Sequence, residues 1–238
     1  MTTTRTVSWR EGGQAFEGLL AVPDGDGPHP AVLVCHAWAG RSEHEEAVAK
    51  RLAGLGYLAL AGDVYGAGVR GGSKEENQAL MEPLVGDRSG VLRARLSAAL
   101  GALTGQPEAA SGKVAAAGYC FGGLCVLDMA RAGLPVSGVA AFHAILGEDG
   151  KPGDGDIATK VLAMQGADDP MATAEDRAAF EAEMTRRGAD WQLHTYGAVM
   201  HAFTNEGAND ADFGTVYDAQ ADRRSWRAFT AFLEETLA

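Results

Sequence analysis

Short apolar runs alternate with amphipathic segments along most of the chain. The run Ala31-Val-Leu-Val-Cys35 has no polar alternation, as expected for a parallel strand that is covered on both faces. Strands are predicted at residues 6–9, 16–22, 31–35, 57–61, 114–119, 136–142, 160–165 and 191–196. Helices are predicted between them, at residues 42–55, 87–103, 123–131, 173–187 and 217–237. Strands that are separated by helices favour a mainly parallel central sheet flanked by helices on both faces.

The stretch from residue 63 to residue 86 breaks this alternation. It is rich in glycine and shows little periodicity, so we expect either an excursion over the sheet edge or a mobile lid. No internal repeat, low-complexity tract or linker divides the sequence. The 238 residues therefore predict a single α/β domain over positions 1–238.

The charge balance narrows the partners that the chain is expected to bind. Its 20 Lys and Arg against 32 Asp and Glu give a formal net charge of -12 at pH 7. Such a field repels phosphate backbones and anionic lipid, so we expect no nucleic acid and no membrane partner. The chain has three cysteines, no apolar run of membrane-spanning length and an N-terminus without a secretory signal. These features predict a cytoplasmic protein with free thiols. We expect a monomer or a homodimer.

The segment Gly118-Tyr-Cys-Phe-Gly122 carries the most specific chemical signal. It has the form Gly-x-nucleophile-x-Gly between an apolar strand and a helix, which is the context that a nucleophile elbow requires. The helix that follows aims its first N–H groups at the turn and favours a thiolate there. We therefore predict that Cys120 is a nucleophile rather than an inert buried thiol, and that Cys35 and Cys125 pack in the core.

A cysteine nucleophile needs a base, and the base needs an acid that orients it. Asp168 and Asp169 follow the strand predicted at residues 160–165, and His201 follows the next strand after a short loop. The chain order of nucleophile, acid and histidine is that of the α/β-hydrolases. The pattern Gly-x-x-Asp-Pro favours Asp169 as the orienting acid, with Asp168 solvated or capping a helix.

These motifs resemble those of the dienelactone hydrolase family of the α/β-hydrolase fold, over essentially the full length of the chain. The resemblance rests on Gly-Tyr-Cys-Phe-Gly-Gly at 118–123, Gly-Ala-Asp-Asp-Pro at 166–170 and His-Ala-Phe-Thr-Asn at 201–205, with support from His-Ala-Trp-Ala-Gly at 36–40 and Asp-Val-Tyr-Gly at 63–66. It implies a cofactor-independent hydrolase of small-molecule esters or lactones that forms a covalent acyl-cysteine intermediate.

The resemblance also implies roles for individual residues. Cys120 is expected to be the nucleophile, His201 the general base and then acid, and Asp169 the group that holds His201. The backbone N–H groups of Phe121 and, counting back from Gly40, of Trp38 are expected to form the oxyanion hole. The residues expected in the substrate pocket are His36, Ala37, Tyr65, His143 and Asn205.

Two positions depart from the family pattern. Family members often carry a Glu where this chain has Ala37, and that Glu interacts with the nucleophile and helps to gate its ionisation. We therefore expect Cys120 to pair directly with His201, as thiolate and imidazolium. Asn205 stands where dienelactone hydrolases place an Arg that binds the substrate carboxylate, so we expect weak activity on dienelactone and better, promiscuous activity on activated neutral esters.

Several alternatives stay open. The same triad suits a promiscuous phosphotriesterase, a thioesterase or an acyltransferase, whereas a ligand-binding relic of the fold has no physical reason to keep all three residues. The spacing of Cys120 and Cys125 is unlike a redox Cys-x-x-Cys pair, and the histidine spacings match no metal motif, so no metal or cofactor is expected. Arg70 or Arg88 could supply a carboxylate contact, and His36 could serve the pocket or only bond the backbone.

Overall fold

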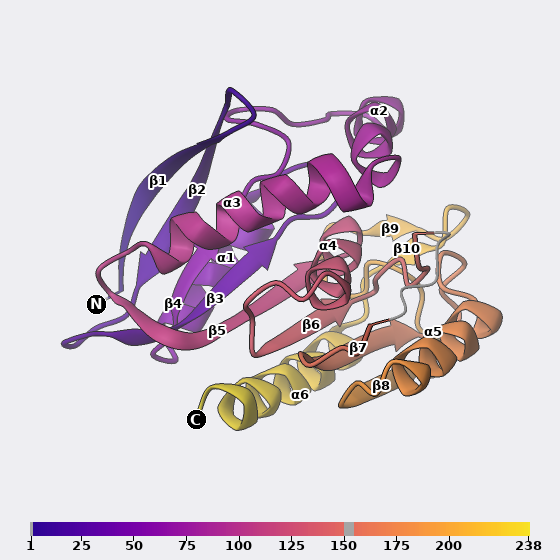
Figure 1. Ribbon diagram of the computed structural model, residues 1–238. Helices are drawn as coiled ribbons and strands as arrows, with labels where there is room; N and C mark the ends of the chain where they lie inside the picture. Colours follow the sequence, from indigo (N-terminus) through magenta and orange to yellow (C-terminus); the bar gives the residue numbers. More distant parts are fainter. Residues whose placement is uncertain (1, 150–154) are drawn as a thin grey trace.

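The computed structural model describes residues 2–149 and 155–238. One eight-stranded sheet crosses the molecule in the order β1-β2-β4-β3-β5-β6-β7-β8 (Figure 1). Its strands are β1 (Thr3–Glu11), β2 (Gln14–Val22), β3 (His29–Cys35), β4 (Leu58–Ala61), β5 (Ala109–Tyr119), β6 (Gly138–Phe142), β7 (Lys160–Gly166) and β8 (Trp191–Tyr196). The pairings of β2 with β1 and β4 are antiparallel, and all pairings from β4 to β8 are parallel. The expected mainly parallel sheet is confirmed.

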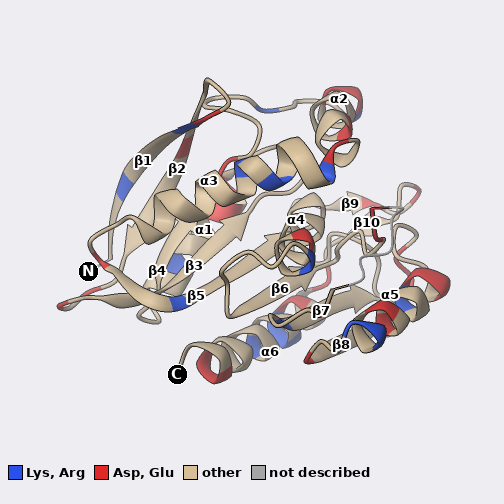
Figure 2. Cartoon of the chain, viewed as in Figure 1, with Lys and Arg blue, Asp and Glu red and all other residues tan. Residues whose placement is uncertain are grey.

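Helices cover both faces of this sheet. They are α1 (Glu43–Ala53), α2 (Lys74–Val85), α3 (Arg93–Thr104), α4 (Phe121–Arg131), α5 (Ala174–Arg186) and α6 (Ala219–Leu237). Side chains of α1 and α6, such as Leu52 and Phe229, share one apolar cluster, and those of α3, α4 and α5, such as Leu96 and Phe180, share the other. The central strands β3, β4 and β6 contain no Lys, Arg, Asp or Glu, and charge lies on the helices, the loops and other strands such as β1 (Figure 2).

The structure differs from the sequence-based expectation mainly between residues 63 and 86. This stretch contains α2, which begins after the N-cap Ser73 and includes Pro83. Its periodicity is weak because most of its residues are at least partly exposed, with Asn77 and Leu84 buried. The predicted helix at 87–103 is also divided, since a π-helical turn (Arg88–Leu92) precedes α3. A short hairpin of β9 (Asn209–Asp210) and β10 (Thr215–Val216) was not predicted.

No helix in the described parts of the chain is long and apolar enough to cross a membrane.

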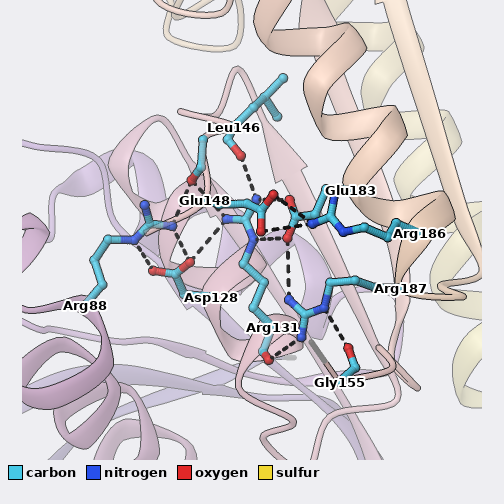
Figure 3. Close-up of polar contacts among 10 residues, drawn as sticks. Arg88, Asp128, Arg131, Leu146, Glu148, Gly155, Glu183, Arg186 and Arg187 are labelled. Carbon is cyan, nitrogen blue, oxygen red and sulfur yellow. Dashed lines mark hydrogen bonds and ion pairs between the residues drawn. The ribbon is translucent and has the colours of Figure 1, made fainter. Parts of the chain in front are cut away.

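A buried network of arginines and carboxylates joins α4, α5 and the segment after β6 (Figure 3). Arg131 donates from Nε and Nη2 to the two carboxylate oxygens of Glu183, at 2.9 and 2.6 Å, and from Nη2 to the carbonyl of Leu146. Arg187 Nη1 lies 3.5 Å from the same Glu183. Arg88 donates from Nε to Asp128 at 2.7 Å. Glu183 therefore contacts two guanidinium groups inside the protein, and Asp128 contacts Arg88 and Arg131.

Removal of Glu183 should destabilise the fold strongly. Its side chain is only 1% exposed, and Glu183→Ala leaves Arg187 without a carboxylate partner among the described residues and Arg131 with Asp128 alone. Breaking a buried ion pair in this way typically costs about 3–5 kcal/mol. Urea denaturation should show this loss, whereas Glu181→Ala, at an exposed position of the same helix, should change the free energy of unfolding by less than about 0.5 kcal/mol. Equal effects of the two substitutions would contradict the importance of the network.

Candidate active site

The carboxyl ends of several strands meet at one cavity of about 430 Å³. Cys120 directly follows β5, His143 directly follows β6, and the segment that begins at Ala37 follows β3. His201 comes from the loop after β8. Ligands of parallel α/β sheets bind at this edge. The cavity therefore lies where the fold brings chemically different side chains together from distant parts of the sequence.

Cys120 occupies a tight turn between β5 and α4. Its backbone has φ 55° and ψ -115°, a conformation that non-glycine residues rarely adopt. The turn depends on neighbours without side chains. A Cβ on Gly118 would lie 1.9 Å from the carbonyl oxygen of Gly122, and a Cβ on Gly122 would lie 2.3 Å from the carbonyl oxygen of Cys35. The strained backbone thus presents Cys120 to the cavity at the first turn of a helix.

The other two cysteines are of a different kind. Cys35 and Cys125 are buried and free, on the side of the sheet that faces α3 and α4. Burial, with a smaller contribution from Glu45, raises the pKa of Cys35 to about 12, and burial also raises the pKa of Cys125. Both stay protonated near neutral pH, which leaves the half-buried Cys120 as the accessible thiol.

His201 is held by Asp169. The His201 Nδ1 atom lies 2.8 Å from Oδ2 of Asp169, and both side chains are almost completely buried. The second oxygen, Oδ1, accepts the N–H of Met171 at 2.8 Å, which fixes the plane of the carboxylate. Asp168 is exposed, and its backbone N–H bonds to Val199. It is therefore Asp169, and not its neighbour, that contacts the histidine.

The environment of His201 favours the imidazolium form. Burial alone would lower its pKa, but the sulfur of Cys120 and the carboxylate of Asp169 outweigh that effect and raise the pKa of His201 to about 10. Within the described structure, Nε2 has no hydrogen-bond partner that is close enough to be assigned. Catalytic hydrogen bonds are often long before substrate binds, so this nitrogen is free to exchange a proton with the cavity.

His143 lies beside His201 and has the opposite character. The two rings are 5.0 Å apart in an edge-to-face arrangement, and His143 Nε2 is 2.8 Å from Oγ1 of Thr204. Burial, and then the charge of His201, lower the pKa of His143 well below its usual range. The site therefore combines one charged and one neutral imidazole.

The loop after β3 is fixed from both sides. The His36 Nδ1–H donates to the carbonyl of Ala37 at 2.7 Å, and Nε2 accepts the N–H of Val64 at 3.2 Å, so the ring is neutral and in one tautomer. Burial also lowers the pKa of His36. The hydroxyl of Tyr65 donates to the carbonyl of Trp38 at 2.9 Å.

Glu45 completes this loop from α1. Its buried carboxylate accepts the backbone N–H of Ser42 at 2.8 Å and that of Ala37 at 3.3 Å. The N–H of Trp38 has no acceptor among the residues that the structure describes, and the same is true of Phe121 at the start of α4. These two amides are therefore available to a ligand.

The cavity contains most, but not all, of the side chains that the sequence suggested for it. Those that line it are Ala37, Trp38, Cys120, His143, His201 and Asn205. His36 and Tyr65 do not belong to the described lining and lie buried behind the β3 loop, where they bond its backbone. Asp169 and Phe121 also lie behind the lining.

Sequence reasoning missed several lining residues. Glu45 lines the cavity, and so do Lys74, Gln78 and Met81 of α2 and the segment around Phe213. The pattern Ser42-x-x-Glu45 is a capping-box signal that locates the start of α1. That signal does not say that the Glu45 carboxylate also faces a cavity.

Neither of the arginines considered for carboxylate binding reaches the cavity. Arg88 is bound to Asp128 in the buried network, and Arg70 bonds the carbonyl of Val69 at the surface. Apart from histidines, the ionisable lining residues of fixed charge are Glu45, Lys74 and Asp210. Within the described residues, no three His, Cys, Asp or Glu side chains gather closely enough to hold a metal ion.

Comparison with known proteins gives this site its class. The chain is 35% identical to the dienelactone hydrolase-like promiscuous phosphotriesterase P91 from metagenomic libraries, whose crystal structure it matches over 100% of this chain and 99% of that chain with a TM-score of 0.93. It also matches the structure named m3DLH, over 100% of this chain and 99% of that chain, with 36% identity and a TM-score of 0.94. A protein of Methylorubrum extorquens named "Putative carboxymethylenebutenolidase" is 27% identical to the chain over 219 residues. This alignment covers 87% of this chain and 72% of the relative.

The protein is an enzyme of the α/β-hydrolase fold. The family model named Dienelactone hydrolase family matches residues 16–237, and the chain belongs to that family. It is accordingly a hydrolase of ester or lactone bonds.

The raised pKa of His201 predicts a specific pH dependence of stability. The folded protein holds the His201 proton up to a pH of about 10, while the unfolded chain releases it near 6.5. The contribution is complete below about pH 6.5 and is lost as pH rises towards 10. Urea denaturation at pH 7, 8.5 and 10 should give a smaller loss of stability for His201→Asn than for the wild type, and identical slopes would contradict this assignment.

Proposed function

We propose that the protein hydrolyses activated neutral carboxylic esters and lactones through a covalent acyl-cysteine intermediate. Cys120 is the nucleophile, His201 transfers protons and Asp169 orients His201. The observation that carries this proposal is the positive-φ turn that places Cys120 in the same cavity as a histidine bound to a buried carboxylate. Promiscuity among activated substrates is part of the proposal, since no arginine clamp lies on the described lining.

Acylation begins when the Cys120 sulfur attacks the carbonyl carbon. The electron pair of the C=O bond moves to oxygen, and the oxyanion accepts hydrogen bonds from the N–H groups of Phe121 and Trp38. The intermediate collapses, the C–O bond to the alcohol breaks, and the leaving oxygen takes the proton from His201 Nε2. The products of this step are a thioester, a free alcohol and a neutral His201.

Deacylation reverses the roles. His201 Nε2 takes a proton from water, and the hydroxide attacks the thioester carbon. The C–S bond breaks, the acid leaves, and Cys120 is again a thiolate beside an imidazolium. Because Ala37 offers no carboxylate to the thiol, this ion pair exists before substrate binds. The raised pKa of His201 supports that resting state.

Phosphotriester hydrolysis is the second candidate function. It is favoured by the 35% identity, over the whole chain, to a protein described as a promiscuous phosphotriesterase. The same thiolate can attack phosphorus, where the P–O bond to the aryl group breaks and the leaving oxygen takes the proton from His201 Nε2. The neutral His201 can then take a proton from water, and the hydroxide breaks the S–P bond and restores the thiolate. The oxyanion donors and His201 therefore serve both substrates in the same way.

Cys120→Ala should abolish turnover. We expect p-nitrophenyl butyrate hydrolysis at pH 8 to fall by at least ~10³-fold, because loss of a nucleophile removes the covalent route entirely. Cys125→Ala, on the buried side of α4, is the matched control and should keep its activity. Paraoxon tested with the same variants should show repeated turnover that also depends on Cys120.

Two outcomes of this experiment would contradict the proposal. If wild type and Cys120→Ala hydrolyse the ester equally slowly, the turn is structural and the fold serves ligand binding. A single paraoxon burst without turnover would remove the second function. Iodoacetamide distinguishes the resting state, because Cys120 should be alkylated faster at pH 7 in the wild type than in His201→Asn, which lacks the imidazolium partner.

Tyr65→Phe should lower kcat more than it changes KM. The hydroxyl bonds the carbonyl of Trp38 and so fixes the residue whose N–H, in the preceding peptide unit, is the proposed second oxyanion donor. Its loss should lower kcat by about tenfold, less than the ~10²–10³ of losing a donor outright. Tyr217→Phe removes a hydroxyl that bonds Asp222 elsewhere and should leave kcat unchanged. A rise in KM alone would assign Tyr65 to substrate binding instead.

A further inference from the structure

An ion pair lies at the cavity between two segments that are far apart in the sequence. Lys74, the first residue of α2, places Nζ 2.8 Å from Oδ2 of Asp210 in β9. Both residues line the cavity. Their side chains are 54% and 43% exposed, so a substrate that enters from solvent can reach them. In the described lining, Lys74 is the only lysine or arginine.

The position of Lys74 is fixed by more than this ion pair. Its Nζ lies 4.0 Å from the centre of the Phe213 ring, which attracts cations through its π face. Phe213 stacks on Trp38 with ring centres 5.7 Å apart. Asp210 accepts the backbone N–H of Phe213 through Oδ1 at 3.0 Å, which leaves Oδ2 for the lysine. The cation is thus held beside the residue whose amide serves the oxyanion.

We propose that Asp210 determines the charge specificity of the cavity by neutralising Lys74. With the pair intact, an anionic substrate must displace Asp210 from the ammonium and also meets Glu45, so neutral substrates are preferred. Without the Asp210 charge, Lys74 is a ready partner for a substrate carboxylate. The substrate preference rests on the proposed ester hydrolysis, whereas the neutralisation of Lys74 by Asp210 does not depend on it.

Local charge at the cavity, rather than the net charge of the protein, acts on a bound substrate. The fixed charges on the described lining sum to one negative charge, with Glu45 and Asp210 against Lys74. Asp210→Asn changes that sum to zero and frees the ammonium. Asn retains a side-chain oxygen that can accept the Phe213 N–H, so the turn is preserved. Asp212→Asn is the matched control, because it removes the same charge from an exposed position of the same loop outside the lining.

The test compares p-nitrophenyl butyrate with the mono-p-nitrophenyl ester of succinate, which differs mainly by a terminal carboxylate. The kcat/KM ratio of anionic to neutral ester should rise roughly three- to tenfold in Asp210→Asn and less than twofold in Asp212→Asn. The double variant Lys74→Met with Asp210→Asn should lose this gain. Because both groups are exposed, 0.5 M NaCl should also reduce it.

A second readout does not require hydrolysis. N-ethylmaleimide and N-(2-carboxyethyl)maleimide both add to Cys120, where the S–C bond forms, the C=C bond opens and the neighbouring carbon takes a proton. Asp210→Asn should raise the relative rate of the carboxylated reagent, and Asp212→Asn should not. If no variant hydrolyses an ester but this ratio shifts, the proposed function fails and the neutralisation stands.

Other outcomes overturn the inference. Equal ratios in the Asp210 and Asp212 variants, for esters and maleimides alike, would show that the ion pair has no effect on charge selection. A wild type that already prefers the succinate ester would show that Lys74 binds carboxylates despite Asp210. A shift with maleimides but not with esters would leave the neutralisation in place and remove its role in substrate choice.

Discussion

The site depends on the close approach of the first turn of α4 to the end of β3. No side chain fits at Gly122, because a Cβ there would lie 2.3 Å from the carbonyl oxygen of Cys35. This contact places the Phe121 amide next to the loop that carries the Trp38 amide. It also requires the sharp turn at Cys120, whose backbone strain is of the order of 1–3 kcal/mol. One packing contact therefore sets the positions of Cys120 and of the two amides that we propose as oxyanion donors.

The three histidines near the β3, β6 and β8 strand ends show how position divides one residue type into different roles. Burial by itself acts to lower the pKa of all three, His36, His143 and His201. Among them, His201 is the one next to both the buried Asp169 carboxylate and the Cys120 sulfur, and these two groups outweigh burial, so the net pKa of His201 is raised. His36 uses both ring nitrogens on the backbone of its surroundings. Because His143 stays neutral, it packs against the His201 imidazolium without like-charge repulsion.

Local patterns in the sequence were enough to predict the parallel sheet and the segments that carry Cys120, Asp169 and His201. Each of these residues directly follows an apolar strand or its short loop, and strand ends meet at one edge of the sheet. Sequence alone could not predict that Glu45 turns inward, because a capping residue on a helix normally faces solvent. It also could not predict the contact between Lys74 and Asp210, which are 136 positions apart and meet only in the folded chain.

The arginines explain why the cavity has so little positive charge. Arg88 donates to Asp128 and to the carbonyl of Gly147, and Arg131 donates to the carbonyl of Leu146 (Figure 3). Leu146 and Gly147 come one and two positions after Ile145, which lines the cavity. The guanidinium groups therefore fix the position of the cavity wall from behind without adding charge to it. Apart from the Cys120 and His201 pair, the charge of the described lining is then left to Glu45 and to the ion pair of Lys74 with Asp210. We therefore expect that a change of one carboxylate is sufficient to alter which substrates the cavity accepts.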